Sequence, residues 1–201
     1  MDTRQAYTIL IALVAAERLV ELALTRRNWR WAQPLGGREY GRGHYPSMVA
    51  VHASFLAACV AEVWLLERPF RPALAAPMLA LVAGAMALRY WAIAALGRRW
   101  STRVVVVPGM PAVTGGPYRW LRHPNYLAVI VETAALPLVH GAWLTAIAYS
   151  LLNGVLLTAR VRAEEAALQR HAGYRELLGA RGRFLPRASP GPRANGRRAE
   201  P

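Results

Sequence analysis

The chain has 201 residues, of which 55% are hydrophobic, and a formal net charge of +14 at pH 7. The apolar residues fall in long blocks instead of an alternating pattern, which excludes an ordinary water-soluble core and predicts an integral membrane protein. The chain has arginine but no lysine, and most arginines border these blocks, so anionic lipid headgroups explain them better than nucleic acid does. A single cysteine excludes an internal disulfide, and scattered histidines exclude a metal cluster.

Successive apolar segments are candidates to cross a bilayer, which takes roughly 20 apolar residues. The last two are short and only His140 and Gly141 separate them, so they predict a tight helical hairpin that dips into or barely crosses the membrane. We therefore expect an all-α integral membrane protein of about five transmembrane helices, formed by one domain over residues 1–186. The candidate spans are residues 7–24, 48–66, 72–96, 124–139 and 142–159.

The distribution of arginine predicts how the chain is oriented. Arginines gather after the first and third spans and from Arg160 onward, whereas the connections after the second and fourth spans hold few or none. By the positive-inside rule the N-terminus lies outside and the C-terminus lies in the cytoplasm.

The segments between and after the spans have distinct patterns. Residues 26–46 form a long, glycine-rich connection that can cover a site. The valines at 104–107, a Pro-Gly turn and residues 112–113 predict two short extended pieces. Residues 161–178 predict a final cytoplasmic helix that lies along the membrane surface and closes over a pocket. Residues 187–201 are low in complexity and predict a disordered tail.

A first polar cluster, Gly-Pro-Tyr-Arg-Trp-Leu-Arg-His-Pro-Asn-Tyr-Leu, occupies residues 116–127. Gly116 and Pro117 predict a tight turn whose backbone can approach a ligand closely. Pro124 suits the first turn of a helix, which places Arg122 and His123 at its N-terminus, where an anionic group binds well. An isolated Arg-His pair would more simply extend to lipid headgroups, but the neighbouring motif residues favour a site.

A second cluster follows the last span, with Arg160, Glu164 and Glu165. Arg160 and Glu164 are four residues apart and can pair along a helix, which is the structural alternative. Two adjacent glutamates can instead give one carboxylate to a salt bridge and the other to a polar ligand.

Charges inside the spans need partners because they are costly in a bilayer. Arg18 and Glu21 can neutralise each other or serve the site, and both alternatives stay open. Glu132 lies two turns after Asn125 on the same helix face, so it can orient a substrate or pair with Arg89. At the start of the second span, His44 is either an interfacial anchor or a substrate contact.

Together, the two clusters resemble the isoprenylcysteine carboxyl methyltransferase family of integral membrane enzymes, over residues 98–186. The resemblance implies S-adenosyl-L-methionine as cofactor, with no metal. Our candidates for catalytic roles are Arg122, Glu132 and His44. The candidates for cofactor binding are Gly116, Pro117, Tyr118, His123, Tyr126, Leu127, Glu164 and Glu165.

The resemblance also bears on the acceptor. The N-terminal half is similar to bacterial members associated with O-methylation of alkylpyrones and alkylresorcinols, which implies a lipophilic acceptor in a bacterial cell membrane; a prenylcysteine carboxyl group is the other O-acceptor considered. A phospholipid N-methyltransferase, a reductase of the sterol-reductase type that binds NADPH, and a non-catalytic scaffold or transporter remain alternatives. The oligomeric state stays open.

Overall fold

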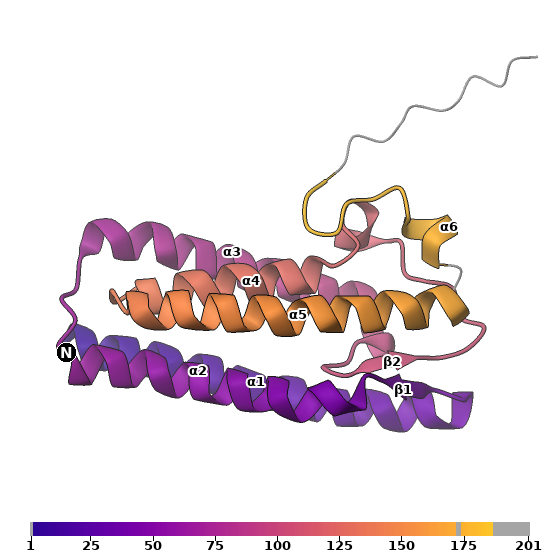
Figure 1. Ribbon diagram of the computed structural model, residues 1–201, viewed down its shortest axis with the longest axis horizontal. Coiled ribbons are helices and arrows are strands. Elements are labelled where there is room, and N and C mark those ends of the chain that lie inside the picture. The colour runs from indigo at the N-terminus through magenta and orange to yellow at the C-terminus, as the bar shows by residue number, and fades with distance from the viewer. Residues whose placement is uncertain (1, 172–173, 187–201) are drawn as a thin grey trace, which may run out of the picture.

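The computed structural model describes residues 2–171 and 174–186, and within this part the chain is mainly helical, with a small two-stranded sheet at one end (Figure 1). The sheet pairs β1 (Arg38–Tyr40) with β2 (Val104–Val106) in an antiparallel register. The helices are α1 (Thr3–Ala32), α2 (Tyr45–Leu65), α3 (Pro72–Leu96), α4 (Pro124–Leu138), α5 (Trp143–His171) and α6 (Tyr174–Leu178).

The long helices run side by side and alternate in direction, so every second connection returns to the end that carries the sheet (Figure 1). Helix α3 packs on α4, α4 on α5, and α2 contacts both α1 and α5. The connection from α3 to α4 and the end of α5 therefore meet at the sheet end, which brings the two polar clusters of the sequence to one place.

Membrane insertion is supported by the apolar helices. Three segments of the described residues are long and apolar enough to cross a bilayer, namely Tyr45–Leu65, Pro72–Arg99 and Trp143–His171. Large apolar side chains face outward on them, such as Leu151 at 69% and Val155 at 71% exposure, which suits lipid. The chain is thus an integral membrane protein; the count of five spans stays a prediction, since α1 carries internal charges and α4 has only 15 residues.

At the end opposite the sheet, α1, α2 and α4 share an apolar core. Tyr7, Phe55, Cys59 and Leu136 are buried there, and the Tyr7 hydroxyl donates to the carbonyl oxygen of Leu136 at 3.2 Å. Cys59 is fully buried, so its role is packing. The short connection from α4 to α5 turns at Gly141, whose φ of 71° favours glycine. It joins the two helices in the predicted hairpin, but α5 is not short as expected, since it has 29 residues.

Three local predictions from the sequence are wrong. Residues 161–171 continue α5 instead of starting a separate helix, because this stretch consists mostly of good helix formers without glycine or proline. Of the two predicted extended pieces, Val104–Val106 forms β2 and pairs with β1, whereas residues 112–113 form no strand. Much of the predicted loop at 26–46 is helical, since α1 continues to Ala32. The predicted disordered tail, residues 187–201, lies outside the described residues.

Candidate functional site

The first polar cluster forms a turn that is fixed against α3. Gly116 starts the short 3-10 helix η4 (Gly116–Arg119) with φ of 57°, and a Cβ atom there would lie 2.7 Å from the Cβ of Ala95. The glycine is thus required by close packing on a helix, and the approach of this turn to a ligand stays a prediction. Pro117 is fully buried in the same turn.

Helix α4 begins at Pro124 with His123 as its N-cap, as predicted. The preceding backbone is held by the C-terminal segment, because the amide nitrogen of Arg122 donates to the carbonyl of Gly182 at 2.9 Å and that of His123 to the carbonyl of Arg183 at 3.1 Å. These bonds fix the direction in which the side chains of Arg122 and His123 leave the backbone.

Glu165 joins the two clusters. Its carboxylate lies 3.1 Å from both Nη1 of Arg122 and Nε2 of His123, and it accepts from Nε and Nη2 of Arg183 at 2.9 and 2.6 Å. Because a carboxylate oxygen only accepts, Nε2 of the buried His123 carries the hydrogen, which is shared with the hydroxyl oxygen of Tyr174 at 3.2 Å. Glu165 therefore ties α5 to the start of α4 and to the C-terminal segment.

Glu164 has different partners. The hydroxyl of Tyr126 donates to its Oε2, and Nε of Arg160 donates to the same hydroxyl at 2.8 Å. Arg160 and Glu164 thus meet through Tyr126, and Nη2 of Arg160 donates to the carbonyl of Thr102 at 2.5 Å. This chain of bonds links α5, α4 and the connection after α3.

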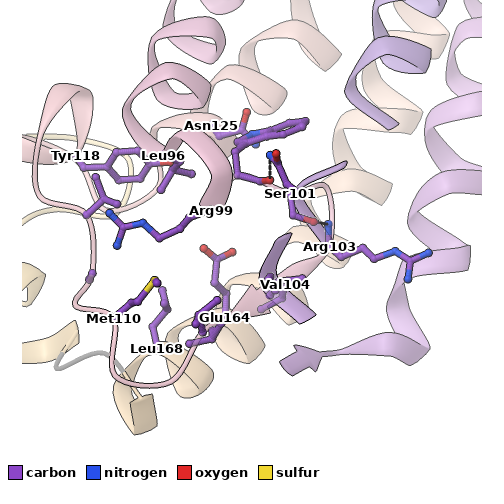
Figure 2. Close-up of a pocket in the computed structure, with 18 of the residues that line it drawn as sticks. Leu96, Arg99, Ser101, Arg103, Val104, Met110, Tyr118, Asn125, Glu164 and Leu168 are labelled. Carbon is purple, nitrogen blue, oxygen red and sulfur yellow. Dashed lines mark hydrogen bonds between the residues drawn. The ribbon is translucent and has the colours of Figure 1, made fainter. Parts of the chain in front are cut away.

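A cleft opens at the sheet end, between α5, the connection after α3 and the start of α4 (Figure 2). Glu164 projects from α5 into it, while Tyr118 and Asn125 lie on the other side (Figure 2). Burial raises the pKa of Tyr118 and of Tyr174, so both hydroxyls stay protonated and can act as donors. The predicted residues in its wall are Tyr118, Arg122, His123, Tyr126 and Glu164; Leu127 lies on α4 outside this lining.

A second, mainly apolar cavity of about 490 Å³ lies between the helices, and we call it the inner cavity. Its volume is within the range of small-molecule sites, roughly 300–1,000 Å³. Apolar side chains of α1, α2, α4 and α5 form most of its wall. The cleft and the inner cavity share the residues Trp100, Asn125, Tyr126 and Arg160.

Trp100 was not predicted as a site residue. It is buried, and Asn28 of α1 holds its backbone by donating from Nδ2 to its carbonyl oxygen at 2.8 Å. Its only signal in the sequence is its place after Arg98 and Arg99 in the connection that precedes the motif. A tryptophan in such a position is as often an anchor at the membrane interface, so the sequence alone does not assign Trp100 to a wall between two cavities.

An ion cluster borders the inner cavity. Arg18 donates to Glu21 at 2.9 Å and to both oxygens of Glu132 at 2.6 and 2.7 Å, while Arg89 donates to Glu21 at 3.2 Å and also to Glu132. Glu132 thus pairs with Arg89, one of the two expected alternatives, and Arg18 and Glu21 do pair. His44 was also predicted as a catalytic residue, but its side chain lies outside the described part of the structure.

The cleft suits S-adenosyl-L-methionine in the kinds of polar group it offers. Glu164 can accept from ribose hydroxyls, and Arg122 at the start of α4 can bind a carboxylate. In the wall, Oδ1 of Asn125, Nε1 of Trp100 and Nε of Arg122 are buried and form no hydrogen bond within the described protein. Unsatisfied donors and an acceptor beside a cleft are what a polar ligand would engage.

Comparison with known proteins shows the family to which the chain belongs. The model of the isoprenylcysteine carboxyl methyltransferase (ICMT) family matches residues 78–170. An uncharacterized protein of Bacillus subtilis, YpbQ, is 38% identical over 167 residues, which cover 83% of this chain and 98% of the relative. An uncharacterized protein of Haemophilus influenzae is 25% identical over 161 residues, 80% of this chain and 93% of that relative.

One similar solved structure is the eukaryotic intramembrane Ras methyltransferase ICMT, without a monobody. It aligns with a TM-score of 0.49 and 23% sequence identity over 70% of this chain, and the chain spans 52% of its length. The family match and the full-length relative from Bacillus subtilis are the stronger findings. The chain belongs to the isoprenylcysteine carboxyl methyltransferase family, whose members are S-adenosylmethionine-dependent methyltransferases.

Proposed function

We propose that the chain transfers a methyl group from S-adenosyl-L-methionine, bound in the cleft, to a lipophilic acceptor bound in the inner cavity. The observation that carries this proposal is the shared wall of Trp100, Asn125, Tyr126 and Arg160. A cleft with several polar groups at the end of the bundle and a mainly apolar cavity inside it meet at these residues. Donor and acceptor can therefore approach from water and from lipid and meet in one place.

In the cleft, this chain's residues bind and orient the donor. Arg122, at the start of α4, would hold the carboxylate, and Glu164 would accept from the ribose, while Tyr118 and His123 line the wall. Glu165 would hold Arg122 and His123 in place through its ion pairs. The sulfonium of the bound cofactor supplies an already activated methyl group, so positioning and exclusion of water are the main tasks left to the protein.

The inner cavity supports an acceptor with a long apolar chain. Its wall is apolar apart from a few groups, chiefly Arg18, Glu21, His52, Arg89 and Arg160. Both acids that an amine acceptor would need, Glu21 and Glu132, are paired with arginine, which weighs against a phospholipid amine. An oxygen acceptor fits better, whether a prenylcysteine carboxylate or the hydroxyl of an alkylpyrone or alkylresorcinol, and between these the function stays a prediction.

Calorimetry on the full chain, purified in detergent, tests the donor. We expect saturable binding of S-adenosylmethionine and S-adenosylhomocysteine, and none of NADPH. Glu164→Gln should weaken S-adenosylhomocysteine roughly ten- to a hundredfold, as expected for one charged hydrogen bond. The matched control Glu176→Gln, at an exposed position of α6, should bind normally.

Two results would overturn the proposal. Binding of NADPH alone would indicate a reductase, and binding of none of the three ligands by a folded protein would favour the non-catalytic alternative. Normal binding by Glu164→Gln would place the donor outside the cleft.

A further inference from the structure

His52 is a polar group of the inner cavity to which nothing above gives a role. It lies on α2, and its Nδ1 is 2.9 Å from the carbonyl oxygen of Met48, one turn earlier. Because a carbonyl oxygen only accepts, Nδ1 carries the hydrogen. A neutral imidazole has one ring hydrogen, so its other nitrogen, Nε2, holds a free lone pair. Within the described residues, no hydrogen bond to Nε2 is found.

The position of His52 relates it to the wall that the cavities share. The sulfur of Met48 is 3.1 Å from Nη1 of Arg160, a residue of that wall. Residues four apart on a helix lie on the same face, roughly 5–6 Å from each other. His52 is therefore one helical turn from the contact with Arg160, on the side of the inner cavity.

The charges around His52 come from every helix that forms the ion cluster and from α5. The same cavity is lined by Arg18 and Glu21 of α1, Arg89 of α3 and Arg160 of α5. Glu132 of α4 pairs with Arg18 and with Arg89. Arg18 and Arg89 disfavour a positive charge on the imidazole, which keeps it neutral at rest, and Glu21 and Glu132 offset part of this repulsion when it takes up a proton. The same arginines stabilise an oxygen that becomes negative beside them and repel a cationic amine.

We propose that Nε2 of His52 accepts the proton of a neutral acceptor hydroxyl, which makes the substrate a long-chain enol or phenol and not a carboxylate. This inference rests on the proposed function. The hydroxyl proton goes to Nε2, and an oxygen electron pair forms the bond to the methyl carbon. The carbon–sulfur bond breaks with its pair going to sulfur, so the single positive charge moves from the sulfonium to the imidazolium. A carboxylate has no proton to lose and would need no such base.

Methyl transfer from radiolabelled S-adenosylmethionine tests this with the full chain in lipid nanodiscs. The acceptors are a long-chain alkylresorcinol, its fluorinated analogue that is already ionised at the assay pH, and palmitate as the carboxylate. The variant is His52→Gln, whose amide cannot take up a proton. The control is Ser54→Ala, an exposed position on the same helix.

We expect the wild-type protein to methylate both resorcinols and not palmitate. His52→Gln should lower kcat on the neutral resorcinol by roughly a hundredfold or more, the usual contribution of a general base. On the ionised analogue the variant should keep a rate within a few-fold of wild type, because no base is needed there. Its affinity for S-adenosylhomocysteine should stay within about twofold of wild type.

The other outcomes contradict the inference in different ways. An equal loss on both resorcinols would give His52 a structural role, and no loss would remove it from proton transfer. Methylation of palmitate alone by the wild-type protein would refute the hydroxyl class but keep the methyltransferase. If the wild-type protein fails to bind S-adenosylhomocysteine, the proposed function fails, and this inference with it.

Discussion

Glu164 and Glu165 are adjacent in sequence, yet their carboxylates have separate partners because they leave α5 in different directions. The Glu165 carboxylate contacts Arg122, His123 and Arg183, and its side chain is only 16% exposed. It joins α5 to the beginning of α4 and to the C-terminal segment. Its main contribution is therefore to stability, whereas Glu164 faces the cleft.

We predict that Glu165→Gln lowers the stability of the detergent-purified protein by about 2–3 kcal/mol, since it leaves two arginines without their anion. The melting temperature, measured by intrinsic tryptophan fluorescence, should fall clearly. Glu176→Gln, at an exposed position, serves as the control and should melt like wild type. An unchanged melting temperature in Glu165→Gln would contradict this role.

The ion cluster in the bundle leads to a second prediction about residues. Arg89→Met should cost about 3–5 kcal/mol, because Glu132 and Glu21 lose one of their two cationic partners in a buried site. Glu132→Gln added to it should restore part of the stability, since the unpaired charge is removed. A double-mutant cycle on thermal unfolding measures the coupling free energy between Arg89 and Glu132. Strictly additive effects of the two substitutions would show that this ion pair does not contribute to stability.

At the scale of elements, the sheet is the contact that holds the loop after α1 against the loop after α3. Glu39 lies opposite Val105 in the register. We predict that Glu39→Cys with Val105→Cys, made in a Cys59→Ser background, forms a disulfide on mild oxidation, since opposed antiparallel residues have suitable Cα separations. Glu39→Cys with Ala112→Cys should not crosslink; if it does and the first pair does not, the register is wrong.

Apolar composition was enough to place the long helices. The bounds of α3 match the predicted span 72–96, because Pro72 starts it, Gly97 ends it and only Arg89 interrupts its apolar run. The strand pairing was missed because β1 is Arg-Glu-Tyr, which has no strand pattern of its own and is held by contacts with β2 and α5. Local propensity cannot reveal a partner that lies more than sixty residues away, as Tyr40 and Val104 do.

The site was predictable where its residues form a recognisable local motif. Tyr118, Arg122, His123, Tyr126 and Glu164 do line the cleft. The inner cavity could not be foreseen, because it exists only where helices α1 to α5 fail to fill the space between them. His52 and Trp100 gain their positions from this packing, and nothing local in the sequence separates them from ordinary interfacial residues.

For the whole molecule, the folding pattern and the arginine distribution point to the same orientation. Both motif clusters and the sheet are at one end, where Arg26 and Arg27 lie near the end of α1 and Arg98 and Arg99 lie in the connection after α3. The positive-inside rule then predicts that this end lies in the cytoplasm, from which S-adenosylmethionine would enter the cleft. The opposite end, with the connection between α2 and α3, would face outward.

Cysteine labelling in bacterial spheroplasts tests this orientation, because Cys59, the single native cysteine, is buried and stays unlabelled. Arg71→Cys, in the exposed connection before α3, should react with a membrane-impermeant maleimide in intact spheroplasts. Thr114→Cys, exposed at the sheet end, should react only after permeabilisation. The reverse pattern would place the cleft outside the cell, where the cytoplasm does not supply the cofactor, and the proposed entry of the donor from the cytoplasm would have to be abandoned.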